Sequence, residues 1–263
     1  MKTIELNFLG KDSVPYKGTI EIDDLAYDII KQLKSQKKDN DQIFDVGSGE
    51  VSEFIKQFDK NISPKMIRTC YGGKILSEEL KKHPINDSMS ESEKKAVYNN
   101  AALEVTKKLN HHKNVAKNFD EQLDKQKDKL KNAKTNAKEK QIKIEEQLKK
   151  IDEQIMKAKN KYKGKELKEK LAVLKEKKEK AKISLEKSKE KINKEKINLE
   201  FKNATKDYAI GTAKGAYSDP RIAYSWCKDA DIDISFIYSK SLAEKFSWAA
   251  DTPADYWRNY PNV

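Results

Sequence analysis

The chain has 263 residues, of which 37% are charged and 37% hydrophobic, with a formal net charge of +12. This composition is too polar for one compact core, so we expect a largely solvated segment. No run approaches the ~20 apolar residues of a membrane span, and residues 1–7 lack an apolar signal core. Only two cysteines occur, Cys70 and Cys227, which indicates an intracellular protein with free thiols. Metal-ligand spacings and phosphate-binding glycine loops are missing from the sequence, so no cofactor is expected.

The positive charge is concentrated in the middle of the chain. Residues 121–200 contain 27 lysines against 16 acidic residues, a net +11 of the total +12. This pattern predicts a basic rod between two nearly neutral parts, and a polyanion is the natural partner of such a rod. The simpler alternative is a lysine-rich helix that is merely soluble.

The first part, residues 1–118, begins with a predicted β-hairpin. Apolar and polar residues alternate around Ile4 and Phe8 and again over residues 19–22, with Lys11 near the turn between them. From about residue 24 the spacing becomes helical. It predicts one helix over residues 25–33 and a second over residues 51–58, with residues 47–49 as a break before the second.

Two later helices carry start signals. Ser63-Pro64 reads as a capping serine followed by proline at the first helical position, with Arg68 in the opening turns. Ser90 and Glu93 have the spacing of a capping box. The helix that they start is expected to close at His111-His112.

Residues 119–206 carry a heptad repeat that is interrupted once. Apolar residues recur every seven positions from Leu123 to Ala158, and the repeat resumes from Leu167 to Leu199, with Gly164 between. Each arm has about 40 residues, or roughly 60 Å of helix. Because the turn is short, we expect an antiparallel two-helix coiled coil whose lysines can approach a DNA backbone without sequence specificity.

Residues 207–263 predict a small helical domain. Its apolar side chains are too few for a very stable isolated unit, so we expect it to dock on the first part and to bring the ends of the coiled coil together. The predicted fold class is therefore mainly α with a small N-terminal β-hairpin. The expected core residues of the last part are Ile222, Trp226, Ile234, Ile237, Leu242, Phe246 and Trp248.

The segment Lys214–Arg221 reads Lys-Gly-Ala-Tyr-Ser-Asp-Pro-Arg. It resembles the tyrosine motif of eukaryotic type IB DNA topoisomerases, Ser-Lys-x-x-Tyr-x-Asp-Pro-Arg. Further segments resemble the family in the same order and at suitable separations: Phe8–Ser13, Arg68-Thr69, Tyr98-Asn99, Asn110-His111 and Lys245–Ala249. The resemblance covers nearly the whole chain. It implies part of a catalytic core over 1–118, a coiled-coil linker over 119–206 and a tyrosine-bearing domain over 207–263.

The resemblance also implies roles for single residues. Tyr217 would attack a DNA phosphorus and form a 3′-phosphotyrosyl bond, which conserves the energy of the broken bond and needs neither ATP nor metal. Arg68 and His111 would hold the non-bridging phosphate oxygens, and Lys11 would protonate the departing 5′ oxygen. Rotation of the free end would then relax supercoiled DNA. The implied location is nuclear and associated with the chromosome.

DNA contacts are implied for Lys11, Asp12, Asn110, Lys214 and Arg221. Each catalytic candidate has a simpler alternative when it is taken alone. These alternatives are a surface lysine on a hairpin, an arginine paired with a carboxylate, a histidine that caps a helix and a tyrosine packed on Trp226. The ordered occurrence of all four candidates favours the catalytic interpretation.

The chain also departs from the family pattern. The family's second phosphate-binding arginine and its DNA-embracing cap have no counterpart here, so double-stranded DNA and an N-terminal topoisomerase half or subunit are the expected partners. We expect a natural second subunit, a fragment of a longer product or a truncated inactive copy. Ala216 replaces an asparagine that contacts camptothecin-type poisons in relatives, whereas Asp12 matches a retained contact, so reduced drug sensitivity is expected.

Two other functions fit the sequence less well. A catalytically inactive coiled-coil or DNA-binding fragment would have the same periodicity and charge. A tyrosine recombinase would share the phosphotyrosyl chemistry, but that chemistry alone does not require the long coiled coil between His111 and Tyr217.

Overall fold

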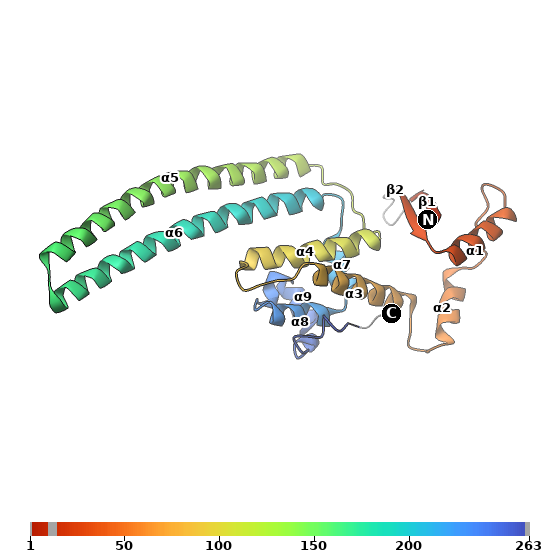
Figure 1. The fold of residues 1–263 in the computed structure, drawn as a ribbon. Helices are drawn as coiled ribbons and strands as arrows, with labels where there is room; N and C mark the ends of the chain where they lie inside the picture. Colours follow the sequence, from red (N-terminus) through yellow and green to blue (C-terminus); the bar gives the residue numbers. More distant parts are fainter. Residues whose placement is uncertain (1, 10–14, 261–263) are drawn as a thin grey trace. The chain divides into compact units, whose positions relative to one another are not determined.

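A computed structural model describes residues 2–9 and 15–260 of the chain (Figure 1). The chain forms two compact units. The first comprises residues 1–82, 101–114 and 207–263, and the second comprises residues 83–100 and 115–206. Helices predominate and the described part contains one two-stranded sheet, which confirms the mainly α fold class. In the ranges 2–9 and 15–260, no helix has the length and apolarity needed to cross a membrane.

The predicted N-terminal hairpin is confirmed. Strand β1 (Lys2–Leu9) pairs antiparallel with β2 (Pro15–Ile22), in a register that places Lys2 opposite Ile22 and Leu9 opposite Pro15. Lys11 and Asp12 lie outside the described residues. The hairpin is followed by α1 (Asp24–Ser35), whose first turn is capped by the Asp23 carboxylate.

Helix α2 (Ser48–Lys56) begins earlier than the sequence suggested. We expected residues 47–49 to precede the helix, but only Gly47 does. The Glu50 carboxylate accepts a hydrogen bond from the Gly47 backbone N–H at 2.7 Å, which stabilises the first turn and draws Ser48 and Gly49 into it. Neither α1 nor α2 contains a buried residue.

Helices α3 (Pro64–Lys82) and α4 (Glu91–Lys108) start where their capping signals predicted. The Ser63 hydroxyl accepts from the Met66 N–H at 3.3 Å. In the capping box of α4, the Glu93 carboxylate accepts from the Ser90 N–H at 2.8 Å. The expected helix end at residues 111–112 was wrong, because α4 stops at Lys108 and the chain turns through a left-handed residue.

The second unit contains the long helices α5 (Phe119–Lys161) and α6 (Gly164–Ala204), which run side by side (Figure 1). Gly164 has a φ of 62°, a conformation that glycine adopts without strain, and it turns the chain between the helices. Hydrogen bonds join Gln126 to Glu195 and Lys178 to Asp152. Residue numbers increase along α5 from 126 to 152 while those of their partners on α6 decrease from 195 to 178. The predicted antiparallel pairing is therefore confirmed.

The C-terminal helices belong to the first unit. They are α7 (Ile210–Ala216), α8 (Pro220–Asp229) and α9 (Lys240–Lys245), with short 3-10 turns η2 (Ile234–Phe236) and η3 (Ser247–Ala249). Ile222 and Trp226 are buried as predicted, but Trp248 is 63% exposed, so its predicted place in the core was wrong. Trp248 lies on the single turn η3, whereas Trp257 fills the core instead.

These helices dock on α3, as the small size of the domain predicted. The Ser77 hydroxyl of α3 donates to the Trp257 carbonyl at 2.6 Å, and the Trp257 N–H donates to the Ser225 hydroxyl at 3.1 Å. All three residues are buried. Two hydroxyl groups therefore satisfy the backbone of the C-terminal segment inside the core, which fixes the docking geometry.

Candidate active site around Tyr217

Tyr217 lies in the short connection between α7 and α8. Its backbone N–H donates to the Ala213 carbonyl at 3.1 Å and so closes the last turn of α7. Two residues later, the Asp219 carboxylate caps α8 by accepting from the Arg221 N–H at 3.0 Å, with Pro220 at the first helical position. The Asp-Pro-Arg half of the motif therefore starts a helix, and it holds the tyrosine between two fixed helix ends.

Helix α3 receives the tyrosine segment on one face. A Cβ atom at Gly72 would lie 2.0 Å from the Tyr217 carbonyl oxygen, so this close approach requires a glycine. One turn away, the Thr69 hydroxyl lies 3.2 Å from the Ala216 carbonyl oxygen and donates to it. Arg68 precedes Gly72 by four residues and therefore projects from the same face.

The end of α4 places His111. Asn110 has a φ of 56°, the left-handed conformation that often terminates helices. The His111 N–H donates to the Thr106 carbonyl at 2.9 Å and the Asn110 N–H donates to the Lys107 carbonyl at 3.1 Å, the paired bonds of a Schellman-type end. Asparagine tolerates this backbone better than most residues, so Asn110 sets the direction in which His111 leaves the helix.

Two other predicted site residues, Arg68 and His111, meet at Tyr217. The Arg68 Nη2 donates to the Leu109 carbonyl at 2.6 Å, and its Cζ lies 5.0 Å from the centre of the Tyr217 ring. The rings of His111 and Tyr217 are 4.4 Å apart at an interplanar angle of 30°. Arg68 thus contacts a carbonyl and the tyrosine ring, and Tyr217 contacts both His111 and Arg68.

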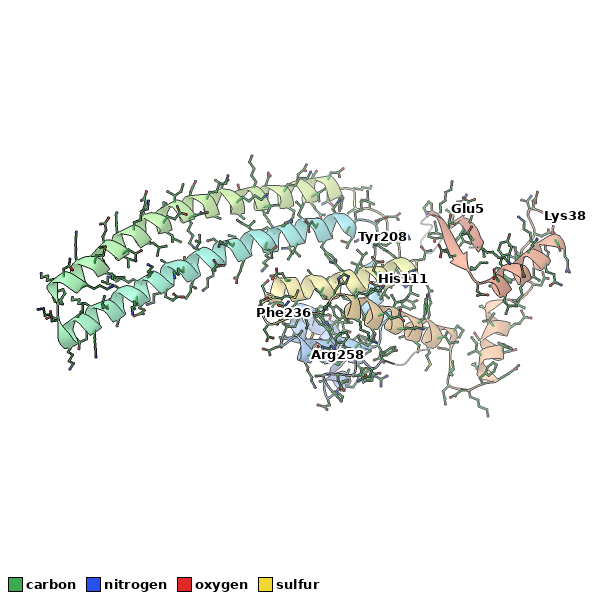
Figure 2. The ribbon with its side chains drawn as sticks, viewed as in Figure 1. Glu5, Lys38, His111, Tyr208, Phe236 and Arg258 are labelled. Atoms are coloured by element: carbon green, nitrogen blue, oxygen red, sulfur yellow. The ribbon has the colours of Figure 1, made fainter. Side chains whose placement is uncertain are left out.

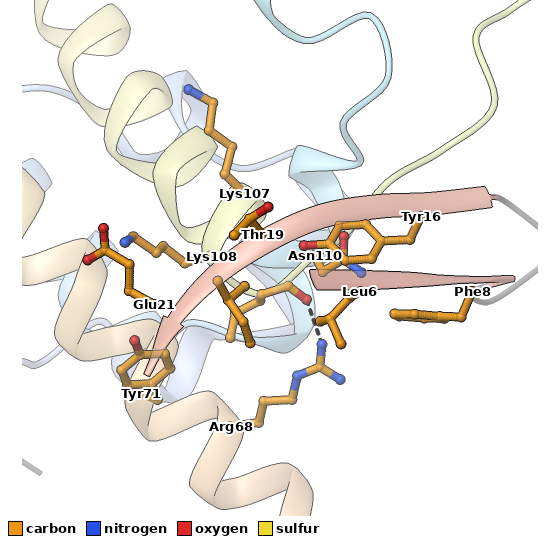
Figure 3. Close-up of a pocket in the computed structure, with 12 residues that line it drawn as sticks. Leu6, Phe8, Tyr16, Thr19, Glu21, Arg68, Tyr71, Lys107, Lys108 and Asn110 are labelled. Carbon is orange, nitrogen blue, oxygen red and sulfur yellow. Dashed lines mark hydrogen bonds between the residues drawn. The ribbon is translucent and has the colours of Figure 1, made fainter. Parts of the chain in front are cut away.

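A cavity of about 780 Å³ lies beside Arg68 (Figure 3). The hairpin residues Leu6 and Phe8 line it together with Arg68 and Asn110. Lys108 also lines the cavity and is exposed, and among the described residues no carboxylate lies within ion-pair distance of it. Lys108 is not among the site residues predicted from the sequence. Its position two residues before Asn110-His111 is the sequence feature that could have indicated a place beside the site.

The connections to α5 and α6 meet at this site. The Lys113 N–H donates to the Asp207 carbonyl at 2.8 Å, and the Ala209 N–H donates to the His111 carbonyl at 2.9 Å. The rings of His112 and Tyr208 lie 4.7 Å apart; Figure 2 labels Tyr208 and His111. This pairing confirms that the two ends of the coiled coil are close together.

The remaining predicted DNA contacts lie among the C-terminal helices or outside the described residues. The Lys214 ammonium donates to the Ile237 carbonyl at 3.3 Å. The Arg221 guanidinium forms a forked pair with Asp219, with Nη2 at 2.6 Å from Oδ2. Neither contact reaches Arg68 or His111, and Lys11 and Asp12 are not described.

A second tyrosine, Tyr256, contacts the aspartate of the motif. The Tyr256 hydroxyl donates to the Asp219 carboxylate at 3.3 Å. Burial and the negative charge of Asp219 raise the pKa of Tyr256 to about 12. The Tyr256 hydroxyl therefore keeps its proton and serves as a hydrogen-bond donor to Asp219.

Comparison with known families matches the same regions. A family described as "Eukaryotic DNA topoisomerase I, catalytic core" matches residues 1–144, which is more than half of the chain. This chain belongs to the eukaryotic DNA topoisomerase I family. A second family, "C-terminal topoisomerase domain", matches residues 189–258 and so includes the tyrosine segment.

Similar proteins come from plants and animals. DNA topoisomerase 1 alpha of Arabidopsis thaliana is 32% identical over 254 residues, which cover 96% of this chain and 26% of that protein. DNA topoisomerase 1 of Daucus carota is 30% identical, over 94% of this chain and 33% of that protein. "DNA topoisomerase I, mitochondrial" of Rattus norvegicus is 26% identical. The chain thus spans about a quarter to two fifths of the topoisomerase I relatives it matches.

Proposed function

We propose that this chain carries the nucleophile and part of the phosphate-binding site of a type IB DNA topoisomerase, which relaxes supercoiled DNA. The observation that carries the proposal is the convergence of Arg68, His111 and Tyr217 from three separate elements. In this proposal residues 1–118 belong to the catalytic core, residues 119–206 form the linker and residues 207–263 form the tyrosine domain.

The reaction begins with attack of the Tyr217 Oη on a backbone phosphorus. The new O–P bond forms as the bond from phosphorus to the 5′ oxygen breaks, the tyrosine proton passes to water and the 5′ oxygen is protonated by Lys11. Arg68 and His111 donate to the non-bridging oxygens, whose charge grows in the transition state. In religation the 5′ hydroxyl attacks the phosphotyrosyl bond and releases Tyr217.

The first part of the site is already oriented before DNA binds. One Arg68 N–H group is fixed on the Leu109 carbonyl, which leaves other donors of its planar fork for phosphate oxygens. Donors that are positioned in advance do not have to reorganise during the reaction. This supports a role for Arg68 in holding phosphate, with Asn110 as the residue that positions His111.

The chain has few arginines, and one of them lies at Tyr217. The sequence contains three arginines. Arg221 is paired with Asp219, and Arg258 with Asp229 at 2.5 Å, so Arg68 is the arginine at Tyr217. We propose that an N-terminal topoisomerase half or subunit supplies the family's second phosphate-binding arginine and its DNA cap.

DNA and the compartment follow from the same proposal. The lysines of α5 and α6 approach the DNA backbone through charge, without reading sequence. Lys11, Asp12, Asn110, Lys214 and Arg221 remain proposed DNA contacts. We place the enzyme in the nucleus on chromosomal DNA, although one relative is named mitochondrial.

Conversion of Tyr217 to phenylalanine tests the proposal. The full chain is combined with the upstream part of the Arabidopsis topoisomerase 1 alpha, and denaturation-stable protein–DNA adducts are counted on a labelled, nicked duplex. We expect Tyr217→Phe to abolish adduct formation while duplex binding changes less than about twofold, because only the nucleophilic oxygen is lost.

Tyr208→Phe is the matched control, since Tyr208 also lies against a histidine ring but outside the motif. It should retain adduct formation. Adducts that persist in Tyr217→Phe would contradict the assigned nucleophile. If the wild-type chain forms no adduct in the assembled complex, the chain is instead an inactive DNA-binding fragment.

A further inference from the structure

A run of aromatic rings connects the hairpin to the segment that follows α4. In the hairpin, the centres of the Phe8 and Tyr16 rings lie 5.2 Å apart. The Tyr16 ring lies 5.9 Å from the His112 ring, and the His112 ring lies 4.7 Å from the Tyr208 ring. His112 is thus in contact with one ring from β2 and one from the connection between α6 and α7. We call the pair of Tyr16 and His112 the hairpin contact.

His112 is held in place by its backbone and by a charged neighbour. It forms an isolated antiparallel β-bridge with Tyr208, and its Nδ1 lies 3.8 Å from a carboxylate oxygen of Asp207. Next to it, the His111 carbonyl accepts from the Ala209 N–H at 2.9 Å. The segment that brings His111 to the candidate active site therefore also presents the His112 ring to the hairpin.

The hairpin contact lies near the end of the hairpin where the two strands are connected. Phe8 pairs with Tyr16 in the strand register, and Leu9 pairs with Pro15 after them. Both rings lie near this end of the hairpin in Figure 3. Lys11 follows Leu9 by two positions in sequence, outside the described residues. The contact therefore acts on the part of the hairpin that leads into the proposed general acid.

The position of the hairpin depends on such contacts. None of its described residues, 2–9 and 15–22, is buried, and a two-stranded hairpin is at best marginally stable alone. Aromatic rings in tilted arrangements at these separations attract one another, so the His112 ring restrains Tyr16 and the strand that carries it. This restraint matters for catalysis, because a misplacement of ~1 Å can lower a rate about 100-fold.

We infer that His112 is a positioning residue for the proposed general acid, Lys11. Through Tyr16 it fixes the hairpin relative to His111 and Tyr217, so that the Lys11 ammonium can give its proton to the departing 5′ oxygen. His112 itself touches no reacting atom. The inference rests on the proposed function and adds to it a residue that the tyrosine motif does not indicate.

Two substrates distinguish a loss of proton donation from a loss of structure. Both are labelled, nicked duplexes, assayed with the assembled complex used to test Tyr217; one keeps the 5′ oxygen at the cleavage site and the other carries sulfur there. Sulfur leaves as a thiolate without a proton, because a thiol has a pKa of ~8.5, far below that of an alcohol. We expect His112→Ala to slow adduct formation at least ~10-fold with oxygen but less than ~3-fold with sulfur. Lys11→Ala, which removes the acid itself, gives the reference pattern.

Three variants test the route through the hairpin contact. His112→Phe keeps a ring between Tyr16 and Tyr208 and should recover the rate with oxygen to within about threefold of the wild type. Tyr16→Ala should reproduce the loss in His112→Ala, and the double variant should be no slower than either single variant, because both remove one contact. His83→Ala is the matched control, because His83 is exposed and lies outside the candidate active site. It should leave both rates unchanged.

Equal losses with oxygen and with sulfur would overturn the inference, since His112 would then support only the fold of the site. It would also be overturned by an unchanged rate with oxygen in His112→Ala, or by losses that add in full when Tyr16→Ala is combined with it. A wild-type complex that forms no adduct with either substrate would instead refute the proposed function, and the inference with it.

Discussion

Helices α5 and α8 differ in the fraction of their residues that is buried. Helix α5 has 43 residues and three of them are buried, Ala133, Ile144 and Ala158. Helix α8 has ten residues and seven are buried. The long helix needs only a narrow apolar seam that repeats along its partner. The short helix is enclosed on several sides, so nearly every side chain has a specific neighbour.

This difference predicts where the chain is sensitive. A repeated seam distributes its stability over many equivalent contacts, whereas an enclosed helix concentrates it in a few large side chains. Substitutions in α8 should therefore disturb the tyrosine site more than substitutions in α5 disturb the helix pair. Four experiments test this difference between buried and exposed positions.

The largest effect is expected at Trp226. It is 1% exposed, so Trp226→Ala should lower the free energy of unfolding of the first unit by about 3–5 kcal/mol. Denaturant unfolding followed by circular dichroism measures it. Trp248→Ala removes the same side chain at a 63% exposed position and should cost less than about 0.5 kcal/mol. Equal losses would show that α8 is not the enclosed element.

The helix pair offers a matched test two residues apart. Ile144 is 5% exposed and Ile142 is 59% exposed on the same helix. Ile144→Ala should destabilise the pair by about 2–4 kcal/mol, and Ile142→Ala by less than about 0.5 kcal/mol. Thermal unfolding of each variant distinguishes them. Similar midpoints for both variants would mean that the seam is not centred on Ile144.

The docking of the tyrosine segment depends on a small residue at position 72. Gly72→Val should cost about 1–3 kcal/mol by forcing the Tyr217 backbone away from α3. It should also lower adduct formation in the assembled enzyme, measured as in the Tyr217 assay. Gly49→Val is the control, because a Cβ at Gly49 would meet nothing within 4 Å. Full adduct formation by Gly72→Val would contradict the close approach.

The effect expected at Cys227 appears only in alkali. Burial raises the pKa of this thiol to about 12. The unfolded chain loses this proton near the ordinary pKa of ~8.5 and the folded chain keeps it, so stability is full below that pH and falls above it, by at most ~1.4 kcal/mol per pH unit. Unfolding between about pH 8.5 and 11 should show a shallower slope in Cys227→Val. Identical slopes would mean that the thiol is hydrated.

Local sequence predicted most of the helices and strands, and the starts of two helices, but not the C-terminal end of α4. The proline after Ser63 and the capping box at Ser90 set the starts of α3 and α4, because capping involves residues close in sequence. The end of α4 was placed too late, since the left-handed turn at Asn110 is compatible with many continuations. The prediction that Trp248 is buried was wrong, because burial depends on which other segments of the chain cover a side chain.

Sequence alone determined the antiparallel helix pair, the mainly α fold and, by its motifs, the family. Those features follow from short-range periodicity and from residue order. Three contacts became known from the folded chain: Arg68 donates to the Leu109 carbonyl, Gly72 leaves room for the Tyr217 backbone, and the His111 ring lies against the tyrosine ring. These contacts join residues 41 to 145 positions apart in sequence. No local pattern encodes them, because they depend on how α3, α4 and α7 pack.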